Sequence, residues 1–258
     1  MQIKEKYSKD MYVLQTLVAR DFKLKYRRSF IGVLWSILNP LLMMIVLSAV
    51  FSFFLKFGNI ENFPLYLILG MTLFNFMAGA TSSAMASIID ASSLIKKVRV
   101  DKIVFPLEKV TFELISFATT LVAVMMVMIF FKVPPTANLL FLPVLLVYIF
   151  MFTLGISLAL AALSVFFRDI MHLWGVIVTA WTYATPIFYP VDILEPWMQN
   201  IMSFNPMFHY ITYYRDIALW GNTPSLEANL LCAGMGIISM LIGLAIFKKS
   251  QNKFILYT

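Results

Sequence analysis

Charged residues are scarce in this chain of 258 residues, because Asp, Glu, Lys and Arg together make up only 13% of the sequence. A soluble domain carries about 25% charged residues, so this chain has too little polar surface to coat a globule in water. Hydrophobic residues make up 61% of the chain, and the mean hydropathy is +0.85. The composition excludes an ordinary soluble domain and predicts one membrane-embedded domain over residues 1–258.

Cysteine and histidine are nearly absent. The single cysteine, Cys232, lies in an apolar stretch and can form neither an intrachain disulfide nor a metal-binding cysteine pair. We interpret it as a small core residue. The two histidines, His172 and His209, fall in loops expected on opposite sides of a membrane, so they cannot build one metal site. The sequence therefore predicts no metal site and no catalytic residue.

A phosphate-binding loop is missing as well. No Gly-x-x-x-x-Gly-Lys-Ser/Thr motif occurs, so this chain cannot itself hold ATP in the P-loop manner. The interiors of the apolar runs also lack ionisable residues, except Glu113 near one end of the third run. Ionisable groups within a membrane commonly mark ion or proton relays. Their scarcity argues against ion-coupled transport, and we expect the energy to come from a partner ATPase.

Long apolar runs are what the sequence has instead. A helix needs about 20 apolar residues to cross a hydrocarbon core of about 30 Å. Runs near or above this length occupy residues 30–55, 63–89, 114–131, 133–167, 173–189 and 228–247. No small-residue cleavage site ends the first run, so we expect it to remain in the mature protein. We predict an all-α membrane protein with six spans within 30–247, a segment 1–29 before them and a tail 248–258.

Positive charges are distributed unevenly among the loops. All but three of the 20 Lys and Arg residues lie before the first run, in the second and fourth loops, or in the tail; the exceptions are Lys56, Lys132 and Arg215. Loops rich in Lys and Arg stay in the cytoplasm. We therefore expect a multi-pass plasma-membrane protein with both termini in the cytoplasm. The same asymmetry explains the net charge of +7 without a nucleic-acid partner.

The N-terminal segment has the periodicity of a basic amphipathic helix. At about 100° per residue, basic side chains fall opposite an apolar face that Lys25 interrupts. The basic residues are Arg20, Lys23 and Arg27, and the apolar residues are Met11, Leu14, Val18, Phe22 and Tyr26. Such a helix lies in the plane of the membrane surface. It is either a simple topological anchor or a helix that also controls the entry of lipid.

The second loop, residues 90–109, mixes apolar and charged residues in a short space. Ser92 and Ser93 can cap a short helix, and Pro106 stands near the start of the third span. We predict a compact amphipathic helix in the cytoplasm. It is either a solvated basic turn or a docking element for a cytoplasmic partner.

The fifth loop, residues 190–227, is long and aromatic. Asn205-Pro206 divides it into the pieces 192–204 and 207–220, which are too short to span a membrane. The aromatic residues in these pieces are Trp197, Phe204, Phe208, Tyr210, Tyr213, Tyr214 and Trp220. We predict a re-entrant helical hairpin on the external side, between the fifth and sixth spans.

Two further patterns leave alternatives open. Small residues run through 78–84 and 155–162, and they either pack helices closely or line a conduit. Aromatic residues gather where the fifth run meets the external side, at Trp181, Tyr183, Phe188 and Tyr189. They form either an interfacial belt or a surface on which sugar units stack at the mouth of a channel.

Several motifs occur together along the chain. They are RDFKLKYRR at 20–28, GVLWSILNP at 32–40, FFRD at 166–169, TPIFYP at 185–190, and Asn205-Pro206 before an aromatic segment. Together with the length, the spans and the second-loop helix, this combination resembles the permease subunits of polysaccharide-exporting ABC transporters. That family includes the exporters of O-antigen, capsule, rhamnan and teichoic acid, and the resemblance covers essentially the whole chain.

The resemblance implies a homodimer of this chain with two copies of a P-loop nucleotide-binding subunit, which binds ATP and Mg²⁺, in a bacterial inner membrane. The second-loop segment resembles the coupling helix that contacts this subunit. That segment comprises Ser93, Leu94, Ile95, Lys96, Lys97, Val98, Arg99, Val100, Asp101, Lys102, Ile103 and Val104. The N-terminal segment resembles the interface helix, and the fifth-loop hairpin resembles the external gate helices.

The substrate implied by the resemblance is a glycan linked to a polyprenyl diphosphate. Arginine binds phosphate in a bidentate manner, and we expect the diphosphate to meet Lys25, Arg27 and Arg28 unless these residues serve only to set topology. The channel and gate aromatics would be Trp181, Tyr183, Phe188, Tyr189, Phe208, Tyr210, Tyr213 and Tyr214. The alternatives are an ABC exporter of a small drug or lipid, a membrane-embedded transferase, and a passive channel.

Overall fold

The computed structural model describes residues 2–26, 32–54, 60, 62–98 and 100–257, and every regular element in these ranges is a helix. The predicted residues Arg27, Arg28, Lys56 and Arg99, and the side chain of Tyr26, lie outside the described part of the chain. The longer helices are α1 (Gln2–Tyr26), α2 (Gly32–Phe54), α3 (Phe63–Asp90), α5 (Val104–Phe130), α6 (Leu142–Phe166), α7 (Ile170–Ala184) and α10 (Leu226–Ser250). The shorter elements are α4 (Ser92–Lys97), η1 (Ala137–Phe141), η2 (Val191–Ile193), α8 (Pro196–Met202), α9 (Pro206–Arg215), the π-helical η3 (Asp216–Trp220), η4 (Gln251–Lys253) and α11 (Phe254–Tyr257).

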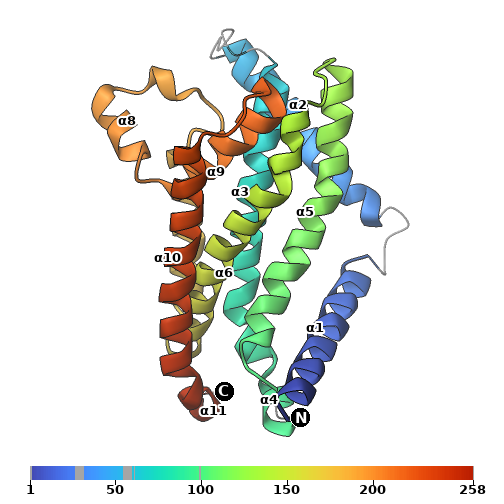
Figure 1. Ribbon diagram of the computed structural model, residues 1–258, viewed down its shortest axis with the longest axis vertical. Helices are drawn as coiled ribbons and strands as arrows, with labels where there is room; N and C mark the ends of the chain where they lie inside the picture. The colour runs from blue at the N-terminus through green and yellow to red at the C-terminus, as the bar shows by residue number, and fades with distance from the viewer. Residues whose placement is uncertain (1, 27–31, 55–59, 61, 99, 258) are drawn as a thin grey trace.

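The long helices run side by side in an elongated bundle (Figure 1). Both termini lie at one end of the bundle together with α4, and we call this the terminal end. Helices α8 and α9 lie toward the opposite end, which we call the distal end. The molecule therefore has two chemically different ends joined by apolar helices.

Five helices in the described ranges are long and apolar enough to cross a membrane, namely α2, α3, α5, the η1–α6 unit and α10. Helix α7 is apolar but has only 15 residues, which is about 22 Å at 1.5 Å per residue. The all-helical prediction is confirmed, and five of the predicted spans have a matching long helix. The predicted count of six spans is not confirmed, because the length of α7 is less than the thickness of a hydrocarbon core.

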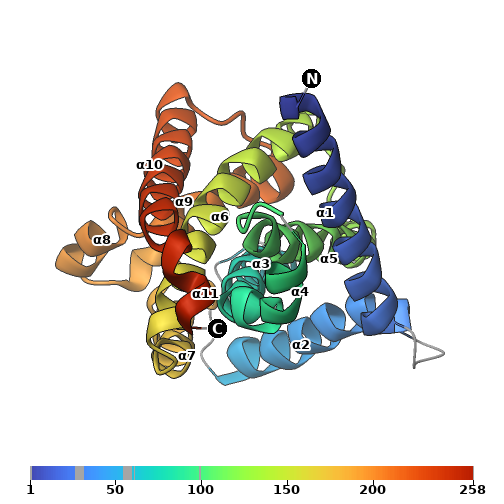
Figure 2. The ribbon, with the colours of Figure 1, turned by 90° about the horizontal axis from the view of Figure 1, so that it is seen from below.

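Helix α3 forms the centre of the bundle, with α2, α5, α6 and α7 around it (Figure 2). Its most apolar stretch is 72% buried, whereas that of α2 is only 6% buried. No charged residue occurs between Phe63 and the final Asp90, so α3 can be enclosed without burying a charge. Helix α2 instead exposes an apolar outer surface, as expected of a helix that faces lipid or another apolar surface.

The small-residue runs serve close packing. In α6, a side chain at Gly155 would collide with the backbone of Ser239 and Met240 in α10, and Gly243 of α10 lies directly against Gly155. In α3, Ala80, Thr81 and Ala84 have no exposed surface. The close-packing alternative is therefore confirmed at these positions, since glycine and alanine let helix backbones approach.

Helix α1 packs on α5. Among its described side chains Leu17 is the most buried at 8% exposure, with Val13 half-buried, whereas Met11 of the predicted apolar face is 54% exposed. The segment is helical as predicted. An ion pair between Asp21 of α1 and Lys109 of α5 joins the two helices, a contact that periodicity alone does not reveal.

The second-loop helix is shorter than predicted. Helix α4 ends at Lys97, Val98 is extended, and α5 begins at Val104, so Val98 and residues 100–103 are not helical. Ala91 occupies the N-cap position and no side chain caps the helix, so the predicted caps at Ser92 and Ser93 are wrong. Ala91 both ends α3 and starts α4, which leaves the two serines inside the first turn.

Candidate transport site

A polar pocket opens on the side of the bundle, where α2, α3 and α5 meet the end of α1. Its volume is about 450 Å³. The residues that line it are Lys25, Gly32, Trp35, Ser36, Asn39, Pro40, Thr72, Asn75, Phe76, Glu113, Ser116, Phe117 and Thr120. We call it the polar seam pocket. It brings together Lys25, a predicted lipid-contact residue, and Glu113, the ionisable residue noted in the third apolar run.

Lys25 is held at this pocket by contacts with α5. Its Nζ donates a hydrogen bond to Ser116 Oγ at 3.0 Å and lies 5.1 Å from the centre of the Phe112 ring. A cation over an aromatic face is attracted by the ring quadrupole. The predicted neighbours Arg27 and Arg28 lie outside the described residues, so Lys25 alone marks the position of the predicted basic cluster.

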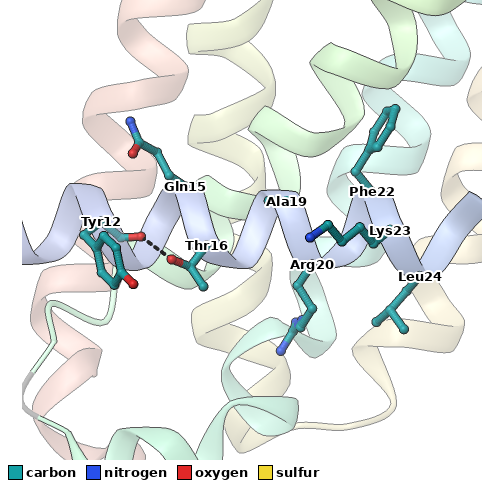
Figure 3. A pocket seen from close by; sticks show the side chains of 8 residues that line it. All are labelled: Tyr12, Gln15, Thr16, Ala19, Arg20, Phe22, Lys23 and Leu24. Carbon is teal, nitrogen blue, oxygen red and sulfur yellow. Dashed lines mark hydrogen bonds between the residues drawn. The ribbon is translucent and has the colours of Figure 1, made fainter. Parts of the chain in front are cut away.

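A second groove, of about 950 Å³, runs along the outward side of α1. Figure 3 shows that Arg20 and Leu24 extend to one side of the helix and Gln15 and Phe22 to the other. Lys23 and Tyr12 also line it. This mixture of cations and apolar groups is the chemistry of a helix at a membrane surface.

The ion pairs at the terminal end tie α1 to the start of α5. Lys109 pairs with Asp21 of α1 and, at 3.3 Å, with its neighbour Glu108. Burial alone would raise the pKa of the Asp21 carboxyl, but hydrogen bonds from Lys109 and Arg20 lower the pKa below its usual value. Asp21 is therefore ionised at neutral pH, and its ion pair with Lys109 joins α1 to α5.

The predicted coupling segment 93–104 is held between α1 and the C-terminal tail. The backbone N–H of Asp101 donates to Asp10 Oδ1 of α1 at 3.3 Å. Lys102 Nζ donates to the carbonyl of Gln251 at 2.6 Å and lies 5.8 Å from the Phe254 ring centre. Ser93, Lys96 and Lys97 remain exposed on α4. The terminal end thus presents a basic surface whose segment 100–104 is fixed by hydrogen bonds to α1 and to the tail. Arg99 of the predicted segment lies outside the described residues.

At the distal end, Asn205 organises the predicted hairpin of α8 and α9. Its Oδ1 accepts hydrogen bonds from the backbone N–H of Met207 and from Trp181 Nε1, and its Nδ2 donates to Thr185 Oγ1. Asn205 therefore caps α9 and ties it to the end of α7. The predicted division at Asn205-Pro206 is confirmed, with α8 projecting from the bundle and α9 packed within it (Figure 1).

The sequence analysis missed the role of Arg215, which it assigned to an external loop. This side chain is 2% exposed, and its guanidinium donates to the carbonyls of Tyr66, Pro186 and Ile187 at 2.9–3.3 Å. It also stacks on the Tyr66 ring, 3.3 Å from the ring centre. Burial lowers the pKa of Arg215 to about 10, so the group stays charged at neutral pH. A lone Arg among tyrosines was the only signal in the sequence.

The predicted channel aromatics divide into two groups. Tyr210, Tyr213 and Tyr214 of α9 are 1% exposed or less; Tyr210 donates to the carbonyl of Cys232, and Tyr213 to Asn229 Oδ1. Burial raises the pKa of Tyr213 to about 12. These three side chains hold α9 in the bundle.

The other predicted aromatics lie at the distal end of α7 or on α9. Tyr183 is 66% exposed, Trp181, Tyr189 and Phe208 are half-buried, and Phe188 stacks on Phe51 of α2 with ring centres 5.7 Å apart. Tyr183 and Phe188 lie beside each other at 5.9 Å. Tyr183 and the half-buried Trp181 and Tyr189 therefore form an aromatic surface where α7 ends, whereas Phe188 is buried at 9% exposure.

The sequence of this chain is similar to those of known transport proteins along most of its length. The family model described as ABC-2 type transporter matches residues 12–219. An O-antigen export system permease protein RfbA of Myxococcus xanthus is 30% identical over 94% of this chain and 94% of its own length. A protein of the same name from Klebsiella pneumoniae is 29% identical over 98% of each chain. The capsule polysaccharide export inner-membrane protein CtrC of Neisseria meningitidis serogroup A is 23% identical over 91% of this chain and 89% of its own length.

Proposed function

We propose, from the premise that the chain belongs to the ABC-2 type transporter family, that it is the transmembrane subunit of an ATP-driven polysaccharide exporter. Its substrate is a glycan linked to a polyprenyl diphosphate, such as O-antigen, capsule or teichoic acid. The observation that carries this proposal is the near full-length similarity to permeases named for O-antigen export. The chain is one transmembrane domain and does not catalyse a reaction by itself.

Energy for export comes from a separate subunit. The chain lacks a P-loop, so two copies of a P-loop ATPase, which bind ATP and Mg²⁺, work with a homodimer of this chain. The segment 93–104 is the contact with this ATPase. Its hydrogen bonds to α1 through Asp101 and to the C-terminal tail through Lys102 support this role. A segment that transmits motion from the ATPase must be fixed to the helices that it moves.

The proposed topology is a bacterial inner-membrane protein with the terminal end in the cytoplasm. Helix α7, extended by residues 185–189, makes the sixth crossing of the membrane, and η2, α8 and α9 form a re-entrant hairpin on the external side. Two hydrogen bonds from Tyr66 of α3 to the carbonyls of Pro186 and Tyr189 support this extension. They place the end of the α7 segment beside the distal end of α3.

Substrate enters at the cytoplasmic side near α1. Lys25, together with Arg27 and Arg28, binds the diphosphate, since Lys25 already stands at the mouth of a polar pocket between helices. The exposed Tyr183 and the half-buried Tyr189 provide a stacking surface for sugars near the external side, and the buried Phe188 supports it from the core. The buried Tyr210, Tyr213 and Tyr214 join such a path only if α9 moves.

The complex of this chain with its ATPase, purified in lipid nanodiscs, provides the test. We expect lipid-linked glycan to stimulate ATP hydrolysis, and the triple substitution of Lys25, Arg27 and Arg28 by Gln to raise the half-stimulating concentration at least about tenfold. A matched triple substitution of Lys248, Lys249 and Lys253, at the other terminus, leaves it unchanged. Stimulation by small drugs or free lipids but not by lipid-linked glycan would assign the chain to another exporter class.

A further inference from the structure

The polar seam pocket opens on the side of the bundle, about halfway along α5. Glu113 is nine residues after the start of α5 and Thr120 is ten before its end, so each lies about 14–15 Å from the nearer end of the helix at 1.5 Å per residue. If α5 crosses the membrane, this pocket lies near mid-depth. Ionisable and amide side chains at such depth are costly unless they serve a ligand, an ion or a partner.

Three polar side chains in this pocket have no partner within the described residues. They are Asn39 of α2, Asn75 of α3 and Glu113 of α5, and no hydrogen bond or ion pair between described residues involves their side chains. Asn75 is exposed although its helix is mostly buried. Asn39 is likewise exposed, and Glu113 is half-buried. Three separate helices thus bring polar groups to one space about halfway along the bundle, where a group that faces lipid needs a hydrogen-bonding partner.

Gly79 gives the Glu113 carboxylate its room. A Cβ atom at Gly79 would lie 3.3 Å from Glu113 Oε2, so the absence of a side chain on α3 allows the carboxylate to lie against it. The pocket therefore combines an acceptor in Glu113, two amides that donate and accept, and an ammonium donor in Lys25. Vicinal hydroxyls beside a phosphate match this set, because carboxylates and amides bind hydroxyls while the ammonium pairs with phosphate.

An apolar groove continues the pocket along the same two helices. Its volume is about 580 Å³. On α2 the polar pocket uses residues up to Pro40 and the groove starts at Leu41; on α5 the pocket ends at Thr120 and the groove starts at Met126. The groove is lined by Leu41, Met44, Ile45, Ser48, Ala49, Ser52, Pro64, Met126, Val127, Phe130 and Phe131. The polar seam pocket is thus followed, along both α2 and α5, by a surface suited to a hydrocarbon chain.

From this arrangement we infer that the α2–α5 seam binds the lipid-linked donor itself, with the membrane-proximal sugar in the polar seam pocket and the isoprenoid chain in the apolar groove. Glu113 accepts hydrogen bonds from the sugar hydroxyls, and Asn39 and Asn75 position the ring. Lys25, whose Nζ lies on Ser116 between Glu113 and the groove along α5, pairs with the diphosphate that joins the sugar to the isoprenoid chain. This inference rests on the proposed function and adds to it a site that selects for the first sugar.

The test compares two probes on the intact complex with its ATPase, in nanodiscs of phosphatidylglycerol. One probe is undecaprenyl diphosphate, and the other is the same lipid carrying one N-acetylglucosamine. Glu113→Gln should weaken binding of the sugar-bearing probe by about tenfold, since a charge-assisted hydrogen bond becomes a neutral one, and leave the bare lipid unaffected. Asn75→Leu on α3 should give the same selective loss of binding. This second variant keeps the test valid if Glu113→Gln folds poorly.

The matched control is Glu227→Gln, which removes the same charge from an exposed position at the start of α10. It should change neither probe. For the groove, Ala49→Phe should weaken both probes, whereas Val46→Phe, on the exposed surface of α2 outside the groove lining, should weaken neither.

Three results would overturn the inference. The first two are that Glu113→Gln weakens both probes equally and that it weakens neither. The third is that phosphatidylethanolamine displaces the sugar-bearing probe from the wild-type complex but not from the Glu113→Gln complex, which would make the pocket a site for phospholipid headgroups. If the wild-type complex responded to neither probe and exported no glycan, the proposed function itself would fail. Normal glycan export by a Glu113→Gln complex that still binds both probes as the wild-type complex does would reject only the sugar site.

Discussion

Arg215 decides how the end of α9 is held against α3 and the segment after α7. Its guanidinium satisfies carbonyls of α3 and of the segment after α7, so three parts of the chain depend on one charged group. The planar fork of arginine suits such a site, and lysine cannot reproduce it. The cost of removing the charge is high because the carbonyls then remain buried without donors.

Arg215→Met should lower the stability of the purified protein by about 3–5 kcal/mol, and Arg215→Lys should recover only part of this loss. Thermal unfolding in detergent, followed by intrinsic fluorescence, measures the effect. Arg168→Gln, an exposed arginine at the terminal end, is the control and should be neutral. Equal melting curves for Arg215→Met and wild type would show that the carbonyl contacts do not stabilise the fold.

Asp21 gives a prediction about pH. Its pKa in the folded protein is lowered, so its contribution to stability is present above the unfolded pKa of about 3.9 and is lost as pH falls through the folded value. Asp21→Asn should therefore destabilise the protein by about 1–2 kcal/mol at pH 7. The difference from wild type should shrink below about pH 4. A difference in melting temperature that stayed constant from pH 7 to pH 3 would contradict this origin.

At the scale of elements, the core helices could be predicted more closely than those that carry charge. The run 63–89 became α3 almost residue for residue, because nothing in it is polar enough to interrupt the pattern. The run 114–131 began ten residues late, since Glu108 and Lys109 resemble a loop in sequence; in the structure Asp21 of α1 pairs with Lys109. Pairing of a charge with a partner on another helix depends on contacts between residues that are distant in sequence, and the periodicity of one segment gives no information on such contacts.

The candidate site shows the same limit. Lys25 and Glu113 were both visible in the sequence, but their convergence with Asn39 and Asn75 depends on how four helices meet. Arg215 was missed because its partner Tyr66 is 149 residues away. Local patterns identify which residues are unusual for a membrane helix, and tertiary packing decides which of them share a site.

The crossing of α6 and α10 tests the packing of elements directly. Gly243→Ala should destabilise the protein by about 1–3 kcal/mol through overpacking, because its side chain would meet the backbone of Gly155. Gly234→Ala, on the same helix with nothing within 4 Å of the added carbon, should instead be stabilising by about 0.5–1 kcal/mol through helix propensity. Thermal unfolding of the two variants should therefore shift in opposite directions, and a shared direction would reject the close crossing.

At the scale of the whole molecule, the charge asymmetry and the helix order make one joint prediction about orientation. Both termini share one end of the bundle with α4, and α8 projects near the other end. If that terminal end is cytoplasmic, α8 must face the outside of the cell. Because Cys232 is buried and is the only cysteine, single cysteines introduced at exposed positions can be labelled against a silent background.

In a Cys232→Ser background, Asn200→Cys on α8 should react in intact spheroplasts with a membrane-impermeant maleimide. Asn252→Cys near the C-terminus should react only after the membrane is permeabilised, since both positions are exposed in the structure but lie at opposite ends. Labelling of residue 252 in intact cells would invert the topology and move Lys25 to the external leaflet. Entry of a lipid-linked substrate from the cytoplasm beside α1 would then be impossible, so this one measurement tests the orientation on which the proposed export direction depends.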